Sequence, residues 1–324
     1  MNANDIFNIN SPQDFEKTTL KVFKLQYDLL PIYRSFCDSI QRNPINVSQL
    51  NQIPFLPIQF FRTHEININP SYDLLFESSG TTQSNTSSHY VADKLLYKTS
   101  FKKSFELFYG PSDEWVWLAL MPTFAERRHS SLVYMTDYFV RHSKHHESGF
   151  YLNRFDNLYQ TILTCMEQNK KIILFGLSYA LLDFAEKYTL NAYDDLMVME
   201  TGGMKGKRDE MIRQELHQIF KDAFHVKQIH SEYGMTELLS QSYSKGDGIF
   251  NSPPWMKVLI RDVYDPLNVG IIGKNGGVNM IDLANIYSCA FIETQDMGFA
   301  HEDGSFEVIG RMETAISRGC NMLI

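Results

Sequence analysis

The stretch from Phe76 to Ser88 is Phe-Glu-Ser-Ser-Gly-Thr-Thr-Gln-Ser-Asn-Thr-Ser-Ser, one glycine among many serines and threonines. Hydroxyl groups and free main-chain N–H groups can together surround the oxygens of a polyphosphate. The stretch is not a Walker loop, because no Gly-Lys-Ser or Gly-Lys-Thr follows it. Taken alone, it fits a phosphate-binding loop and a flexible polar surface loop equally well.

Three further motifs follow the loop along the chain. Ser-Glu-Tyr-Gly-Met-Thr-Glu occupies Ser231–Glu237 after an expected strand, Thr-Gln-Asp-Met-Gly occupies Thr294–Gly298, and Gly310-Arg311 comes last. Each match is short, so it is the set of four motifs in this order that favours a nucleotide site.

The four motifs together resemble those of the adenylate-forming superfamily of acyl and aryl ligases. In that superfamily they are the phosphate loop, the Tyr-Gly-x-Thr-Glu signature, the acidic ribose-binding motif and the hinge motif. The segment Leu56–Arg62 resembles one in the phenylacetate-ligase branch, and the ending Arg318–Asn321 resembles the LuxE-type acyl-protein synthetases. The resemblance extends from about residue 50 to the end of the sequence.

The resemblance implies that the loop holds the β- and γ-phosphates of ATP while an acid attacks the α-phosphorus. Gln83 stands where glycine is usual, and no lysine or arginine follows within the loop. Phosphate neutralisation is then expected to depend on Mg²⁺ and on residues elsewhere. His89 is one candidate, with a polar residue at a helix start as the alternative. The loop residues expected to contact nucleotide are Ser78, Ser79, Gly80, Thr81 and Thr82.

Catalytic roles are implied for the Ser231–Glu237 motif. Tyr233, followed by Gly234, is expected to lie against the adenine, and Thr236 is expected to bond the α-phosphate. Glu237 is expected to hold Mg²⁺, because a metal-bound carboxylate offsets the repulsion between the acid and the α-phosphate. The alternative for Glu237 is a solvated or helix-capping charge.

The remaining implied contacts come from three places. Gly202 and Gly203, after Thr201, resemble the glycine segment beside the adenine, or else form a plain turn. Asp296 is expected to accept hydrogen bonds from the ribose hydroxyls, or else to end a strand. Arg311 is expected to reach the ribose or phosphate from the hinge, or else to pair at the surface.

Members of the superfamily continue past the hinge into a mobile domain that carries a catalytic lysine and helps to bind coenzyme A. Because only residues 312–324 follow Arg311 here, most of that domain is expected to be absent. Lys205 and Lys207 could compensate for the lysine or be solvated helix-start residues. In LuxE-type proteins a cysteine near the C-terminus takes the acyl group, which implies this role for Cys320 beside Arg318. An inert terminal cysteine is the alternative.

Composition places the chain among ordinary folded proteins. Its 324 residues are 44% apolar and 21% charged, and the formal net charge is −8 without a long basic run, which disfavours a nucleic-acid partner. No apolar stretch approaches the roughly 20 residues of a membrane span, and the N-terminus has no export signal. Four separated cysteines fit a reduced, cytoplasmic setting, with Cys37, Cys165 and Cys289 expected in the core.

The pattern of elements predicts an α/β fold: a layered α/β core with a smaller β-rich subdomain. Domain boundaries are expected at 1–245 for a core with a helical N-terminal region, 246–311 for the β-rich part and 312–324 for a tail with Cys320. Helices are predicted over 14–40 with a break at Pro31, 92–109 and 208–220. Strands are predicted over 115–120, 171–175, 195–199, 226–230, 257–261, 277–282 and 305–309.

Two histidine groups have structural and functional interpretations. His142, His145 and His146 have no acidic or cysteine partners at ligand spacing, so a solvated helix face is favoured over a metal site. His230 adjoins the Ser231–Glu237 motif and fits either a nucleotide pocket or a hydrogen-bonded structural histidine.

The resulting hypothesis is an enzyme that uses ATP and Mg²⁺ to activate a carboxylic acid, with a fatty acid favoured, as acyl-AMP and then forms a thioester on Cys320. The implied partners are the acid and an acyl-reductase or acyltransferase. Two alternatives stay open: an acyl-CoA ligase that uses free coenzyme A, and a non-catalytic module that binds nucleotide and a partner protein.

Overall fold

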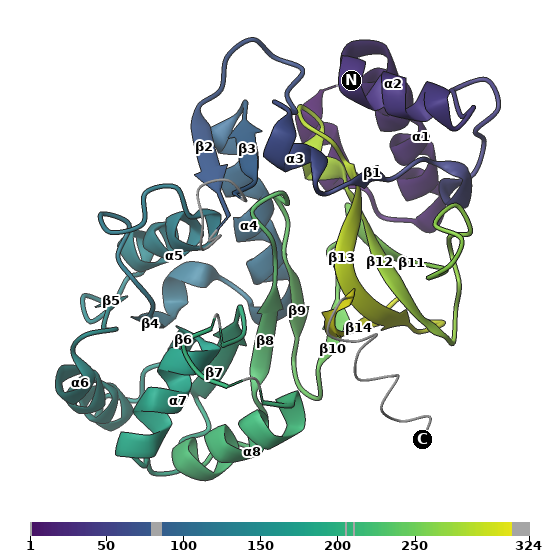
Figure 1. Cartoon of the computed structure of the whole chain (residues 1–324). Coiled ribbons are helices and arrows are strands. Elements are labelled where there is room, and N and C mark those ends of the chain that lie inside the picture. Colours follow the sequence, from purple (N-terminus) through teal and green to yellow (C-terminus); the bar gives the residue numbers. More distant parts are fainter. Residues whose placement is uncertain (1, 79–85, 205, 210, 313–324) are drawn as a thin grey trace, which may run out of the picture. The chain divides into compact units, whose positions relative to one another are not determined.

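The computed structural model describes residues 2–78, 86–204, 206–209 and 211–312. The chain divides into two compact units (Figure 1). The terminal unit comprises the residues up to Ser104, Met235–Ser240 and the residues from Asn251 onward, and the central unit comprises Phe105–Gly234 and Gln241–Phe250. The long helix α4 (Lys94–Tyr109) contributes residues to both units.

The central unit is an α/β structure built on a parallel sheet. Four neighbouring strands lie in the order β4-β6-β7-β8, the short β5 pairs in parallel with β4, and β9 pairs antiparallel with β8. Every residue of β4, β6 and β7 is buried, as is typical of parallel strands covered by helices. The strands are β4 (Val116–Leu120), β5 (Gly149–Phe150), β6 (Ile172–Leu177), β7 (Leu196–Thr201), β8 (His230–Tyr233), β9 (Ser242–Ser244) and β10 (Ile249–Asn251).

Helices connect the parallel strands of the central unit. Helix α5 packs against β4, and α7 packs against β6 and β7 with α8 beside it (Figure 1). Ser130 caps α5 by accepting a hydrogen bond from the main chain of Val133 at 3.4 Å. Helix α8 ends at Phe224 and is capped by His225, which adopts the left-handed conformation that commonly closes a helix. The helices are α5 (Ser131–His142), α6 (Phe155–Glu167), α7 (Ser178–Lys187) and α8 (Arg213–Phe224).

The terminal unit is built around an antiparallel sheet in the order β11-β12-β13-β14. The two-residue strand β1 adds to it in parallel with β13, and β2 and β3 form a separate hairpin. The strands are β1 (Leu56–Pro57), β2 (Leu74–Glu77), β3 (Ser88–Val91), β11 (Met256–Arg261), β12 (Asn275–Asp282), β13 (Phe291–Ala300) and β14 (Phe306–Arg311).

The N-terminal helices belong to the terminal unit because they pack on its sheet. Helix α1 (Pro12–Leu29) ends before Pro31, which begins α2 (Pro31–Ser39), since a proline cannot continue the preceding helix. The ring of Tyr33 stacks on that of Phe291 at 5.9 Å. The buried amide of Gln26 donates to the carbonyls of Asn285 and Ile286 and accepts from the main chain of Ala290.

Contacts divide the described chain at other places than the expected boundary at residue 245. The first 104 residues cluster with the C-terminal strands and not with the central α/β sheet, and the Met235–Ser240 segment joins them. The cause is long-range pairing: β1 bonds to β13, and α1 covers the same strand. The expected tail with Cys320 lies outside the described residues.

The strand predictions over 115–120, 171–175 and 195–199 correspond to β4, β6 and β7. The one over 226–230 is displaced, because β8 begins at His230, and helix α8 likewise begins later than expected. Pro57 lies in the two-residue strand β1, and its neighbour Ile58 supplies the N–H that bonds the carbonyl of Glu293. No helix among the described residues is long and apolar enough to cross a membrane.

Candidate nucleotide site

The base of the phosphate loop is closed by paired serines. Strands β2 and β3 run antiparallel with Glu77 opposite Ser88. The main-chain N–H of Ser78 donates to the carbonyl of Ser87 at 3.0 Å, and the N–H of Ser87 donates to the hydroxyl of Ser78 at 2.9 Å. The other predicted loop contacts, Ser79, Gly80, Thr81 and Thr82, lie outside the described residues, as does Gln83.

Glu237 is a buried carboxylate beside this hairpin, with 4% of its surface exposed. Desolvation raises its pKa, while a hydrogen bond from Ser87 and the positive charges of Arg311 and Arg62 act in the opposite direction. The terminal unit therefore places an acidic side chain, a hydroxyl that follows the loop and two guanidinium groups in one cluster. The cluster brings together three sequence-predicted elements: the loop base, Glu237 and Arg311.

The main chain around Glu237 is held by three buried side chains. His89 bonds the carbonyl of Thr236 at 2.8 Å, and the amide of Asn285 donates to the carbonyl of Glu237 at 2.7 Å. Asp282 accepts from the N–H groups of residues 239 and 240, from the Ser240 hydroxyl and from the N–H of residue 284. The sequence analysis considered His89 only as a phosphate-neutralising candidate, and it assigned no role to Asn285 or Asp282.

His89 differs from both sequence interpretations. It lies in strand β3 and not at a helix start, and it is 1% exposed. Its ring nitrogens contact the Thr236 carbonyl and the Ser288 hydroxyl. Burial lowers its pKa to about 4, against a smaller opposing effect of the Thr236 bond, so the ring is neutral at pH 7. It therefore carries no charge with which to neutralise a phosphate.

Asp296 and Arg311 face each other across β13 and β14. They are direct register partners, and Arg311 Nε lies 3.3 Å from Asp296 Oδ1. The N–H of Asp296 donates to the Thr294 hydroxyl at 3.1 Å. The buried guanidinium of Arg261 donates to the Thr294 carbonyl at 2.8 Å and also to the carbonyl of Val278 and the side chain of Asn279. Arg261 thus fixes the strand segment that presents Asp296.

A second group of predicted residues lies at the carboxyl ends of β7 and β8 in the central unit. Ligands of open parallel sheets bind at this edge. Gly202 and Gly203 follow β7 with φ of 75° and 63°, in the left-handed region that favours glycine. Tyr233 ends β8 half-buried, with its ring 5.9 Å from that of Phe250, and Gly234 follows it. The Ser231–Glu237 motif is thus divided between the two units, after Gly234.

Two carboxylates below these glycines were missed by sequence reasoning. Glu200 Oε2 accepts from the Ser178 hydroxyl at 2.6 Å, Glu200 Oε1 accepts from the Ser231 hydroxyl at 2.8 Å, and His217 Nε2 lies 3.6 Å away. Next to it, the Thr201 hydroxyl donates to Glu232 at 2.5 Å. These contacts stiffen the ends of β7 and β8. The residues come from four separated segments, and no local spacing signals their meeting.

His230 is a structural histidine. Its Nδ1 hydrogen-bonds the Tyr109 hydroxyl at 3.2 Å, and the two rings pack edge to face. Burial, with a smaller contribution from the Lys245 charge, lowers its pKa to about 4.

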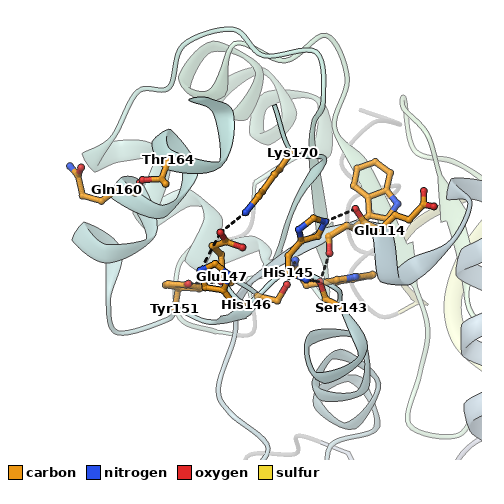
Figure 2. Close-up of polar contacts among 12 residues, drawn as sticks. Glu114, Ser143, His145, His146, Glu147, Tyr151, Gln160, Thr164 and Lys170 are labelled. Atoms are coloured by element: carbon orange, nitrogen blue, oxygen red, sulfur yellow. Dashed lines mark hydrogen bonds and ion pairs between the residues drawn. The ribbon is translucent and has the colours of Figure 1, made fainter. Parts of the chain in front are cut away.

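The histidine run occupies the end of α5 and the turn after it, so only His142 is on a helix. His145 bonds the carbonyl of Glu114 at 3.1 Å, and the exposed His146 lies 3.5 Å from Glu147, which pairs with Lys170 (Figure 2). Among the described residues no group of three or more His, Cys, Asp or Glu could hold a metal ion.

Comparisons with solved structures identify the fold. ATP-bound MatB from Rhodopseudomonas palustris matches 75% of this chain and 49% of its own, with a TM-score of 0.55 and 15% identity. The amide bond synthetase McbA from Marinactinospora thermotolerans matches 74% of this chain and 48% of its own, with a TM-score of 0.53 and 16% identity. 2-Hydroxyisobutyryl-CoA ligase in complex with 2-HIB-AMP matches 93% of this chain and 68% of its own, with a TM-score of 0.64 and 11% identity.

No family model matches the sequence, and no curated protein matches it. The chain spans about half the length of the MatB and McbA chains. At these identities the likeness concerns the fold, and it confirms the predicted class. The chain has the α/β fold of the N-terminal domain of adenylate-forming enzymes.

Proposed function

We propose that this protein activates a carboxylic acid with ATP, giving an acyl-adenylate and pyrophosphate. The observation that carries the proposal is the cluster of Ser87, Glu237, Asp296 and Arg311 in the terminal unit, formed from motifs far apart in the sequence. A structural role alone does not require a buried glutamate to meet both a loop hydroxyl and the positive charge of the hinge arginine. The fold shared with ATP-bound MatB supports the same function.

The proposed roles follow from the chemistry of each side chain. Ser78 and the loop residues as far as Thr82 hold the phosphates. Tyr233, Gly234 and the Gly202–Gly203 segment line the adenine, and Asp296 accepts from the ribose hydroxyls while Arg311 neutralises phosphate charge. Thr236 donates its hydroxyl to the α-phosphate.

Mg²⁺ is the metal that fits Glu237. Mg²⁺ in nucleotide sites is held by one or two carboxylates together with phosphate oxygens, and Glu237 supplies one buried carboxylate beside the loop. When bound, the metal lowers the repulsion between the acid and the phosphate. The desolvated position of Glu237, which raises its pKa, is one that a nearby cation would favour.

The acyl acceptor is proposed to be the thiol of Cys320. The three cysteines that the structure describes are buried, and burial raises the pKa of Cys37 to about 12 and that of Cys165 to about 11, with Cys289 raised further. None of these three can supply a thiolate at neutral pH. Cys320, beside Arg318, is the thiol proposed by the LuxE-type resemblance, which also suggests a fatty acid and a partner acyl-reductase or acyltransferase.

Coenzyme A is the alternative acceptor, since a fold neighbour is a CoA ligase. The two acceptors are distinguished by incubating the protein with ATP, Mg²⁺ and radiolabelled acids of different chain length. We expect pyrophosphate release together with protein-bound label that hydroxylamine removes. Cys320→Ser should keep pyrophosphate release and lose the label, and Cys37→Ser serves as the control.

Two outcomes would contradict parts of this proposal. If none of the acids tested gives pyrophosphate release while ATP still binds in calorimetry, the protein is a nucleotide-binding module and the proposed enzymatic activity is wrong. If acyl-CoA still forms in Cys320→Ser, the role of Cys320 as acyl acceptor is wrong, and the proposed adenylation step is retained.

A further inference from the structure

We propose that Arg62 binds the pyrophosphate portion of ATP and supplies the positive charge that the loop itself lacks. The inference deepens the proposed function and rests on it. The loop from Phe76 to Ser88 contains no lysine or arginine. A polyphosphate held there needs cationic partners from other segments, because its charge is otherwise balanced by hydroxyls and main-chain dipoles alone.

Strand β1 fixes where Arg62 lies. Leu56 and Pro57 pair with Ile292 and Glu293 of β13, and the N–H of Ile58 donates to the carbonyl of Glu293 at 2.9 Å. The single-turn helix α3 (Phe60–Thr63) begins two residues later. Its Arg62 reaches β13 again, where Nη2 lies 3.5 Å from Gln295 Oε1. Arg62 therefore stands beside the residue that precedes Asp296.

Helix α3 also contacts the loop hairpin. The buried ring of Phe61 packs edge to face on that of His89, 5.7 Å between centroids. His89 in turn bonds the carbonyl of Thr236. The residue before Arg62 is thus packed on the strand that leaves the loop, and that strand is bonded to the segment that carries Glu237. All of these residues belong to the terminal unit.

The charge of Arg62 is available to a ligand. Its side chain is exposed, and among the described residues its polar partner is the neutral amide of Gln295. The other arginines of this region are committed differently: Arg261 is buried against three oxygen acceptors, and Arg311 faces Asp296. Arg62 and Arg311 both act on Glu237. Of these two arginines, only Arg311 has a carboxylate within 4.0 Å; Arg62 has none among the described residues.

The proposed reaction assigns a task to such a cation. An oxygen of the acid's carboxylate forms a bond to the α-phosphorus, and the bond from that phosphorus to the oxygen bridging to the β-phosphate breaks. The electron pair leaves with the pyrophosphate, so negative charge grows on the β-phosphate as the bond lengthens. A guanidinium can donate two parallel hydrogen bonds to phosphate oxygens. Arg62 at this place stabilises the leaving group and strengthens ATP binding.

Calorimetry with three ligands tests the assignment: ATP, AMP and inorganic pyrophosphate, each with Mg²⁺. Arg62→Gln should weaken binding of ATP and pyrophosphate roughly 10- to 100-fold, the effect of losing a charge-assisted hydrogen bond. AMP should bind within about twofold of wild type, because it lacks the β- and γ-phosphates. Arg62→Lys keeps the charge without the paired donors and should fall between.

Lys21→Gln is the matched control, since it removes one positive charge from an exposed site on α1 of the same unit. Unchanged binding of ATP and pyrophosphate by Arg62→Gln would overturn the proposal. An equal loss for AMP would overturn the assignment to the pyrophosphate portion. If the expected binding pattern is found but no acid gives pyrophosphate release, the assignment of Arg62 is retained and the proposed enzymatic function is wrong. Wild-type protein that binds neither ATP nor pyrophosphate would overturn both.

Discussion

The imidazole of His89 donates a hydrogen bond from Nδ1 to the main-chain carbonyl of Thr236 at 2.8 Å, across 147 residues of sequence. Because a carbonyl can only accept, Nδ1 carries the proton, and the neutral Nε2 accepts from the Ser288 hydroxyl at 3.0 Å. The strand that leaves the phosphate loop is therefore joined directly to the residue beside Glu237.

Two replacements of His89 separate its two hydrogen bonds. Asn places an amide N–H near the position of Nδ1, and Gln places an amide oxygen near that of Nε2. Both should lower the free energy of unfolding by about 1–3 kcal/mol, since each leaves one buried partner unsatisfied. His89→Asn should retain more pyrophosphate-releasing activity than His89→Gln, because it keeps the Thr236 contact. Equal activity in the two variants at equal stability would show that the contact does not position the Glu237 segment.

His230 makes stability depend on pH. Its pKa in the folded protein is about 4, below the usual value of 6.5. The unfolded chain takes up a proton below pH 6.5 while the folded protein does not, so stability falls as pH drops from about 6.5 to about 4. Urea unfolding across this range should show His230→Asn losing up to about 3 kcal/mol of that dependence. The exposed His146→Asn is the control; a wild-type slope in both variants would refute the assignment.

Arg261 holds Asp296 in place through Thr294. Arg261→Met leaves three buried oxygen acceptors without their donors, and we expect the free energy of unfolding to fall by about 3 kcal/mol. Arg141→Met removes an exposed ion pair with Asp137 and should cost less than about 1 kcal/mol. Thermal unfolding of the two variants makes the comparison.

Gly277→Ala tests the same contact without removing the charge. A Cβ at Gly277 would lie against the guanidinium carbon of Arg261, so the alanine must displace that side chain. AMP affinity measured by calorimetry should fall in both Gly277→Ala and Arg261→Met, because each disturbs the segment before Asp296. If both variants bind AMP with wild-type affinity, Arg261 stabilises the sheet and does not contribute to nucleotide binding.

Glu200 is a buried carboxylate that the fold keeps ionised. Burial alone would raise its pKa, but His217, Ser178 and Arg213 together outweigh it and lower the pKa below 4.5. Its ionised form therefore stabilises the fold above the unfolded pKa, and this contribution is lost as pH falls through the folded value. Glu200→Gln should destabilise the protein by about 1–3 kcal/mol at pH 7 and by less at pH 3 in urea titrations, because the contribution of the ionised carboxylate declines below its unfolded pKa. A constant difference at both pH values would contradict the ionised assignment.

The sequence was sufficient to predict those elements whose signal is local. The runs of β4, β6 and β7 are apolar throughout, and Pro31 marks the end of α1. Strand β13, the longest in the terminal unit, was not predicted, because polar residues such as Glu293, Thr294 and Gln295 interrupt its apolar pattern. Their polarity is compensated by cross-strand contacts, which a single strand's sequence does not contain. Helices α5, α6 and α7 were likewise not predicted.

The candidate site shows the same division. Motif order was enough to select Glu237, Asp296 and Arg311, which the structure gathers in one unit. The order of the motifs did not identify the residues that hold these three side chains in place. Arg261 and Asp282 interact through pairings set by strand register, and Glu200 meets its partners at a sheet edge. Such contacts depend on which strands are neighbours, and spacing along the chain carries no record of that.

The anchoring of the Glu237 segment by Asp282 sets an order of events during synthesis. A nascent chain extending to residue 281 already contains the whole phosphate loop and the Ser231–Glu237 motif, yet it lacks the carboxylate that binds the N–H groups of Leu239 and Ser240 and the amide that binds the Glu237 carbonyl. These residues come from the end of β12 and the turn beyond it. A ribosome-bound chain can thus hold the Glu237 segment in its folded position only after nearly nine-tenths of the sequence shown has been translated.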